Sequence, residues 1–191
     1  LVAAAAPAAE LTVLDRCGPP VHVTEGWASR HGMAVTAVVA DVLDDRVGHP
    51  AYDAVITHGL FSLVAPADRP TLAARWHDLL RPGARLVTTT SLAPPGTPDP
   101  HGFAPEAVEA FAERAAAEGA TPEVVEAARA WASRAVVHPV RGAEEVVALL
   151  SVAGLDPDVE VHEVEGQLDR AASGPTAARS ATYLHVLATR R

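Results

Sequence analysis

The sequence predicts an α/β fold, in which a mostly parallel sheet is covered by helices on both faces. Short apolar stretches rich in β-branched residues alternate along the chain with longer stretches of helical periodicity. The last two apolar stretches are joined without a helical stretch, which predicts a closing antiparallel pair of strands. The 191 residues, 49% of them hydrophobic and 20% charged, are sufficient for a single domain (1–191) with a helical insertion.

The expected elements follow from periodicity and from the prolines and glycines that interrupt it. Strands are expected at 11–14, 35–40, 52–57, 85–90, 159–164 and 182–188. Helices are expected at 21–31, 69–80, 105–118, 122–134 and 144–153, and residues 1–6 are expected to be the tail of an Ala-rich helix. Pro19 and Pro20 are expected to break the chain before the first complete helix, and Gly32 to end that helix.

Composition excludes several classes of function. A net charge of -9 disfavours nucleic acid as a partner, and no apolar run approaches the roughly 20 residues that span a bilayer, so no membrane partner is expected. All 15 basic residues are arginines, so P-loop, Schiff-base and Tyr-x-x-x-Lys chemistries are absent. With Cys17 as the one cysteine and no histidines at ligand spacing, we expect a cytoplasmic protein without a metal.

Polar side chains occur where three of the expected strands end. Asp15, Asp41 and His58 each follow an apolar stretch directly. In open parallel sheets, ligands bind beyond the carboxyl ends of the strands. These residues are therefore expected to face a binding crevice.

Four stretches of the chain carry a resemblance to a known family: TVLDR, AVVADVLD, YDAVITHGLFSLV and WHDLLRPGARLVTTTSL. In this order, and over nearly the whole chain, they resemble the class I S-adenosylmethionine-dependent methyltransferases. The turn RPGARL is similar to the family's L-x-P-G-G-x-L segment, with Ala84 in place of the second glycine. The resemblance implies a Rossmann-like fold, S-adenosylmethionine as cofactor and S-adenosylhomocysteine as product.

The resemblance also implies roles for individual residues. Asp15 would accept hydrogen bonds from the ribose hydroxyls, since a carboxylate offers paired acceptors to a vicinal diol, and Arg16 would flank the adenine or ribose. Asp41 would accept from the adenine amino group, and the backbone N–H of Val42 would serve a ring nitrogen. Thr57, together with the histidine that follows it, would line the cleft near the sulfonium and the substrate.

The glycine-rich loop of the family is missing from the sequence. No G-x-G occurs in the chain, which starts where the helix after that loop would end. A domain without its central strand would leave neighbouring strands unpaired. We therefore expect this strand and its loop to precede Leu1.

The acceptor side of the site is expected in the second half of the chain. His58 is the candidate general base, because histidine can take up a proton at neutral pH. Phe61, His101, Phe103 and His138 are candidate substrate-binding residues. The insertion at 103–134 is expected to form a lid over a small acceptor or, alternatively, an interface of a homo-oligomer.

The residues themselves leave alternatives open. Asp15 could cap the following turn or helix, Asp41 could form an Asx-turn, and His58 could bond a neighbouring loop. The favoured function is methyl transfer to a small molecule. The alternatives are a non-catalytic methyltransferase-like binding or assembly module, or an NAD(P)-dependent oxidoreductase, in which Asp15 would hold a ribose in the same way.

Overall fold

The computed structural model describes residues 9–44, 51–117, 119–165 and 180–191. The chain folds as two compact units, Leu1–Pro50 and Ala51–Arg191. The expected Ala-rich helix at 1–6 and most of the segment that joins the last two strands lie outside the described residues.

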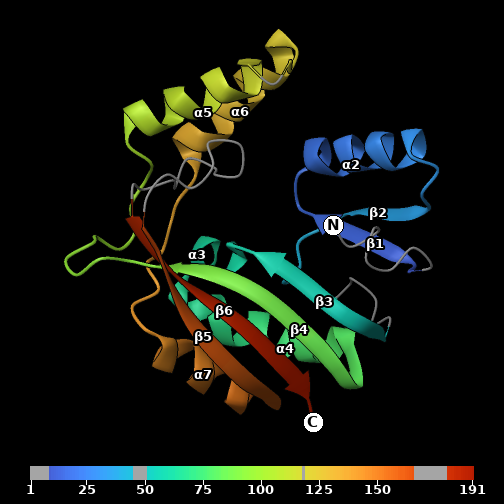
Figure 1. The fold of residues 1–191 in the computed structure, drawn as a ribbon, viewed down its shortest axis with the longest axis vertical. Coiled ribbons are helices and arrows are strands. Elements are labelled where there is room, and N and C mark those ends of the chain that lie inside the picture. Colours follow the sequence, from blue (N-terminus) through green and yellow to red (C-terminus); the bar gives the residue numbers. More distant parts are fainter. Residues whose placement is uncertain (1–8, 45–50, 118, 166–179) are drawn as a thin grey trace. The chain divides into compact units, whose positions relative to one another are not determined.

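The first unit is a β-α-β element (Figure 1). Strands β1 (Leu11–Asp15) and β2 (Val35–Val39) pair in parallel, with Leu11 opposite Val35 at the start of the pair. Helix α2 (Gly18–Arg30) connects them and packs on both strands. The carboxyl ends of the two strands therefore lie side by side.

Helix α2 begins earlier than the sequence suggested. Pro19 and Pro20 lie in its first turn instead of breaking the chain before it, so that expectation was wrong. The first turn of a helix has no intrahelical partners for its N–H groups, and proline is therefore tolerated there. Gly32 follows the helix in the left-handed conformation, with φ of 67°, as a helix C-terminus favours.

The second unit contains a four-stranded sheet of order β3-β4-β6-β5. β3 (Tyr52–His58) and β4 (Leu80–Leu92) are parallel, whereas β6 (Ser180–Arg190) is antiparallel to both β4 and β5 (Leu155–Glu165). The predicted α/β class and its closing antiparallel pair are confirmed. β5 starts four residues before the expected strand because it is an edge strand, where Pro157 removes no necessary ladder bond.

Short and long helices cover one face of this sheet. β3 is followed by α3 (Leu60–Leu63) and the 3₁₀ turn η1 (Pro66–Asp68), neither of which was expected. α4 (Arg69–Leu79) and α7 (Ala143–Val152) pack against each other and lie on the same side of the strands (Figure 1). Their apolar side chains form the core with those of the sheet, the largest being Trp76, Leu72, Leu80, Leu86, Leu150, Leu155 and Leu184.

The helical insertion forms a hairpin of α5 (Pro105–Ala117) and α6 (Pro122–Arg134), at bounds close to those expected. The helices pack along each other, with Ala112 and Ala132 fully buried. The hairpin leaves the sheet after β4 and returns before α7, and it stands beyond the end of the sheet where β4 finishes (Figure 1). Within the described residues, no helix has the length and apolar character to cross a membrane.

Candidate functional site

The first unit places two carboxylates at one end of its sheet. Asp15 is the last residue of β1 and lies opposite Val39, and Asp41 follows β2 after one further residue. The backbone N–H of Ala40 donates to the carbonyl of Asp15 over 3.0 Å, which holds the two strand ends together. The parallel pairing thus brings Asp15 and Asp41 to the same carboxyl edge.

Both carboxylates also make local turns. One oxygen of Asp15 accepts the backbone N–H of Cys17 at 2.7 Å, and one oxygen of Asp41 accepts that of Leu43 at 2.9 Å. These are Asx-turns, the structural alternative to a ligand-binding role. An ionised carboxylate can accept about four hydrogen bonds, so each side chain keeps acceptor capacity beyond its turn. The turns fix the carboxylates in place and are compatible with ligand binding.

The residues beside the carboxylates differ in exposure. Arg16 is exposed after Asp15, and Val42 is half-buried in the turn after Asp41. Cys17 is half-buried and precedes α2. The expected cofactor contacts of Arg16 and Val42 stay predictions.

In the second unit, Thr57 and His58 end β3 and point to opposite faces of the sheet. The hydroxyl of Thr57 donates to that of Thr88 on β4 over 2.7 Å, on the face where Thr88 is buried. His58 is exposed, and its Nδ1 atom is hydrogen-bonded to the hydroxyl of Thr89, its neighbour in register on β4. The expected bond of His58 to a nearby loop is therefore a bond to the adjacent strand.

The bond to Thr89 has a chemical consequence for His58. If Nδ1–H donates to the threonine oxygen, the lone pair is on Nε2, where it can accept a proton from a substrate. If the threonine hydroxyl donates instead, Nε2 carries the hydrogen and cannot act as a base. The threonine oxygen can take either role, so His58 is held in orientation in both tautomers.

Phe61 lies in the core and not on an open surface. It is 1% exposed, its ring is 6.1 Å from that of Trp76, and the guanidinium of Arg69 lies 5.1 Å above it. The turn that leads to Phe61 begins at Gly59, whose φ of 68° is the left-handed conformation that glycine favours. A direct contact between Phe61 and an acceptor stays a prediction, and it would require this packing to open.

His101, Phe103 and His138 all belong to the two chain segments at the base of the α5–α6 hairpin. The backbones of His101 and Val137 exchange hydrogen bonds of 3.0 and 2.8 Å, which pairs the two chain segments that enter and leave the hairpin. The ring of His138 bonds Asp99 at 2.8 Å. Phe103 lies 6.1 Å from Trp131, in an aromatic group on the hairpin.

Arg69 was not recognised in the sequence as a residue of interest. It is 1% exposed and bonds the carboxylate of Glu145 and the carbonyl of His138. The spacing of the residues could have indicated its burial. Arg69 precedes Leu72 by three residues and Trp76 by seven, so it shares the apolar face of the helix with them. A charged residue on such a face is buried only with partners.

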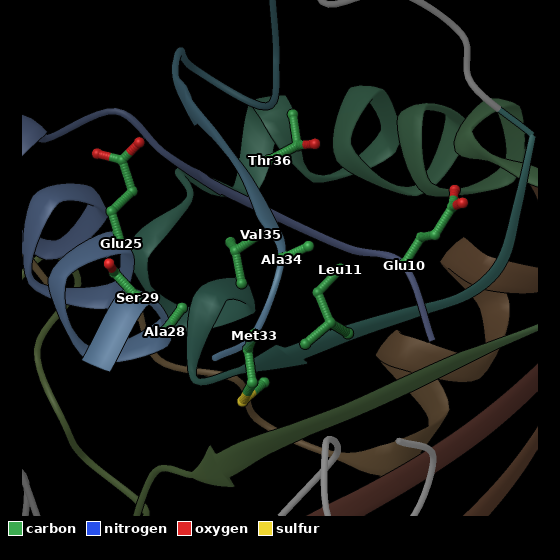
Figure 2. A pocket seen from close by; sticks show the side chains of 9 residues that line it. All are labelled: Glu10, Leu11, Glu25, Ala28, Ser29, Met33, Ala34, Val35 and Thr36. Carbon is green, nitrogen blue, oxygen red and sulfur yellow. The ribbon is translucent and has the colours of Figure 1, made fainter. Parts of the chain in front are cut away.

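A hollow of about 570 Å³ lies elsewhere in the first unit. Leu11 and Val35, the first residues of β1 and β2, line it together with Ala28 and Met33, and Figure 2 shows Glu10 and Glu25 on opposite sides of this apolar group. This is the amino end of the strands. The hollow is therefore separate from the edge that carries Asp15, and we assign it no cofactor.

The side chains with a shifted pKa lie on the surface of the hairpin and not at the candidate site. The bonds of Arg129 to Glu109 and Glu126 raise the pKa of that guanidinium. Hydrogen bonds from its own backbone and from Thr121 lower the pKa of Glu123. Among the described residues, no three His, Cys, Asp or Glu side chains are arranged to hold a metal ion.

Solved structures share this fold. A methyltransferase from Methanosarcina mazei, described as dependent on S-adenosylmethionine, aligns with a TM-score of 0.62 at 14% identity, over 99% of this chain and 86% of that one. Geranyl diphosphate methyltransferase in complex with S-adenosylmethionine aligns with a TM-score of 0.61 at 15% identity, over 100% and 73%. The [4+2]-cyclase SpnF aligns with a TM-score of 0.60 at 13% identity, over 96% and 66%.

These matches show the fold and leave the reaction open. No protein-family model matches the chain, and a search of curated protein sequences gives no significant match. The chain has the Rossmann-like fold of S-adenosylmethionine-dependent methyltransferases. A cyclase is among the similar structures, so the reaction has to be inferred from the residues of the site.

Proposed function

We propose that this chain is an S-adenosylmethionine-dependent methyltransferase that acts on a small molecule. The observation that carries the proposal is the placement of Asp15 and Asp41 at the carboxyl ends of two paired parallel strands. It occurs in a fold shared with methyltransferases that use this cofactor. Ligands of open parallel sheets bind at this edge.

The hydrogen-bonding groups at this edge fit the polar groups of the cofactor. The carboxylate of Asp15 offers two oxygens to the ribose diol, and that of Asp41 offers an acceptor to the adenine amino group. The backbone N–H of Val42 would donate to an adenine nitrogen, and Arg16 would cover the ring or the ribose. Rigid Asx-turns keep both carboxylates oriented before the ligand arrives, which lowers the entropic cost of binding.

On the acceptor side, the chain would hold the substrate and exclude water. S-adenosylmethionine supplies a methyl group on a positively charged sulfur, which a nucleophilic atom of the acceptor can attack in line. Thr57 is proposed to line the cleft, and His101, Phe103 and His138 are proposed to contact the acceptor from the hairpin base. Alignment of the reacting atoms and exclusion of water lower the barrier without a covalent intermediate.

His58 is proposed as the general base. With Nδ1–H donating to Thr89, its Nε2 would take the proton of an acceptor hydroxyl or of an acidic amine. An acceptor that is already nucleophilic would need no base. The net charge of -9 supports a small molecule over nucleic acid as the acceptor, and we keep the cytoplasm as the proposed location.

A panel of cofactors tests this proposal through the melting temperature of the full chain. A ligand at about 100 times its Kd stabilises the folded state by about 2.7 kcal/mol, which raises Tm by roughly 5 °C or more in a protein of this size. S-adenosylmethionine and S-adenosylhomocysteine are expected to produce this shift, and NAD and NADP are not. A shift with NAD alone would support the oxidoreductase.

A non-catalytic module is the second candidate function. The local turns made by both carboxylates favour it, because they give Asp15 and Asp41 a structural role without a ligand. If S-adenosylhomocysteine binds but no methyl group leaves S-adenosylmethionine with a broad panel of hydroxyl, amine and carboxyl acceptors, this candidate replaces the enzyme. Release of S-adenosylhomocysteine that depends on an acceptor would exclude it.

A further inference from the structure

Arg69, the first residue of α4, is a charged side chain placed in the core of the second unit. It is 1% exposed. A guanidinium carries five N–H donors and stays charged at all accessible pH values, so its burial is tolerated only with several acceptors. The hydrogen-bond acceptors of Arg69 show which segments of the chain it connects.

The acceptors of Arg69 come from three separate segments. Nε donates to the carbonyl of Val64 over 3.3 Å, in the segment that follows α3. Nη2 donates to the carbonyl of His138 over 2.9 Å and lies 3.4 Å from that of Pro139, in the segment that returns from the hairpin. Nη1 forms an ion pair with Glu145 on α7.

The same guanidinium stacks on a candidate substrate-binding residue. Its central carbon lies 5.1 Å from the centre of the Phe61 ring, a distance typical of a cation–π contact. Phe61 lies three residues after His58, the proposed base. Arg69 therefore links the turn after β3 to the chain that leaves the hairpin.

Further bonds extend this arrangement to both segments at the hairpin base, residues 97–103 and 135–141, which we call the two legs. The backbone N–H of His138 donates to the carbonyl of Ser62 over 2.8 Å, and its ring bonds Asp99 on the other leg at 2.8 Å. Arg141 donates from its side chain to the carbonyl of Thr97 over 3.0 Å. Its backbone N–H lies 3.3 Å from Glu145, the partner of Arg69.

A buried ion pair is a weak source of stability, because desolvation of the two charges cancels much of their attraction. Arg69 instead gives a fixed geometry, because its planar fork meets a carboxylate and two backbone segments in set directions. We propose that Arg69 is a positioning residue that fixes the two legs, and with them the hairpin and Phe61, on the acceptor side of the site. This inference rests on the proposed function for its role in methyl transfer.

Hydrogen exchange of the full-length protein tests the positional part without any ligand. Arg69→Met keeps a long apolar side chain but removes every polar bond, so we expect amides of the two legs to exchange about 10- to 100-fold faster. Amides of β4 and β6 are expected to exchange as in the wild type. Arg69→Lys keeps the charge but not the fork, and it should restore part of the protection.

Arg129→Met is the matched control for this substitution. Arg129 also binds two partners, Glu109 and Glu126, but on the exposed surface of the hairpin. Exposed ion pairs contribute little, so exchange in the legs should change less than about threefold. Should Arg69→Met fail to fold, Arg69→Lys provides the test, since it keeps a charge in the core but loses the fork that meets both backbone segments, and exchange in the legs should still be faster than in the wild type.

Two further measurements separate this inference from the proposed function. Calorimetry with S-adenosylhomocysteine should give the same Kd for Arg69→Lys and the wild type within about twofold. With any acceptor that the wild type methylates, the KM of Arg69→Lys for that acceptor should rise about 10-fold, while its kcat changes less. Absence of S-adenosylhomocysteine binding in the wild type would contradict the proposed function but leave the role of Arg69 in the legs intact.

Two results would overturn the inference. One is unchanged exchange in the legs of Arg69→Met and Arg69→Lys. The other is an equal loss of protection in the legs and in β4 and β6, which would make Arg69 an ordinary contributor to global stability.

Discussion

The residues proposed to bind the cofactor, in the first unit, and those proposed to bind the acceptor, in the second unit, are held in place by contacts of very different range. On the cofactor side, Asp15 and Asp41 each bond a backbone N–H two residues further along the chain. On the acceptor side, His138 bonds Asp99 across 39 residues, and Arg69 bonds Glu145 across 76. The carboxylates are therefore set by local turns, whereas the hairpin base depends on the packing of the whole second unit. Substitutions on the two sides should accordingly have different effects.

The largest effect is expected on the acceptor side, at His58. His58→Ala should lower kcat about 100-fold with an acceptor that needs a base, because general base catalysis contributes at least this factor. Affinity for S-adenosylhomocysteine should stay within about twofold. Methyl transfer kinetics and calorimetry measure the two quantities.

The control for His58 is His22→Ala, which changes an exposed histidine of α2. Thr89→Val should give an intermediate kcat, because it removes the hydroxyl that orients the His58 ring. A kcat within threefold of the wild type for His58→Ala would restrict this residue to lining the cleft.

Asp15→Asn should show the opposite pattern on the cofactor side. The asparagine oxygen can preserve the turn with Cys17, but the charge is lost and the amide presents donors to the ribose hydroxyls. Loss of charge-assisted bonds of about 2 kcal/mol corresponds to roughly 30-fold weaker binding of S-adenosylhomocysteine. Glu10→Gln, just before the other end of β1, is the matched control and should bind as the wild type does.

A smaller effect is expected at Asp41, which has one proposed partner on the cofactor. Asp41→Asn should weaken S-adenosylhomocysteine about 10-fold, since its amide would oppose the adenine amino group. Analogues with hydrogen in place of this amino group should bind the wild type and the variant alike. A full 10-fold difference with such an analogue would place Asp41 elsewhere in the site.

The smallest effect is expected at Glu123 on the hairpin. Its pKa is lowered in the folded protein, so its ionised form stabilises the start of α6 above the unfolded pKa, and this contribution is lost as the pH falls through the folded value. Glu123→Gln should raise amide exchange at the start of α6 less than about threefold at neutral pH. Below the lowered pKa the variant and the wild type should exchange alike; a difference that persists there would assign the effect to packing.

The range of contacts also explains how much the sequence could predict. The strand ends at Asp15, Asp41 and His58 were located because each follows a local apolar stretch, and the hairpin helices because their periodicity spans 13 residues each. The early start of α2 was missed because Pro19 and Pro20 break most elements and are compatible only with a first turn. α3 was missed because a helix of four residues has no periodicity.

The contacts among the proposed acceptor-binding residues could not be predicted from the sequence, for a physical reason. Nothing near Asp99 in the chain indicates that its partner is His138, and nothing near Arg69 indicates Glu145. The burial of Phe61 under Arg69 follows from the packing of α4 on the sheet, and not from the residues around Phe61. Residues that bind through long-range contacts can be suspected from a charge on an apolar face, as at Arg69, but their partners need a structure.

Calorimetric titration of the full chain with S-adenosylhomocysteine tests the central claim most directly. We predict saturable binding at one site per chain, weakened roughly 30-fold in Asp15→Asn and unchanged in Glu10→Gln. Binding that Asp15→Asn leaves unchanged, or no heat of binding from a wild-type protein that melts cooperatively, would contradict the account.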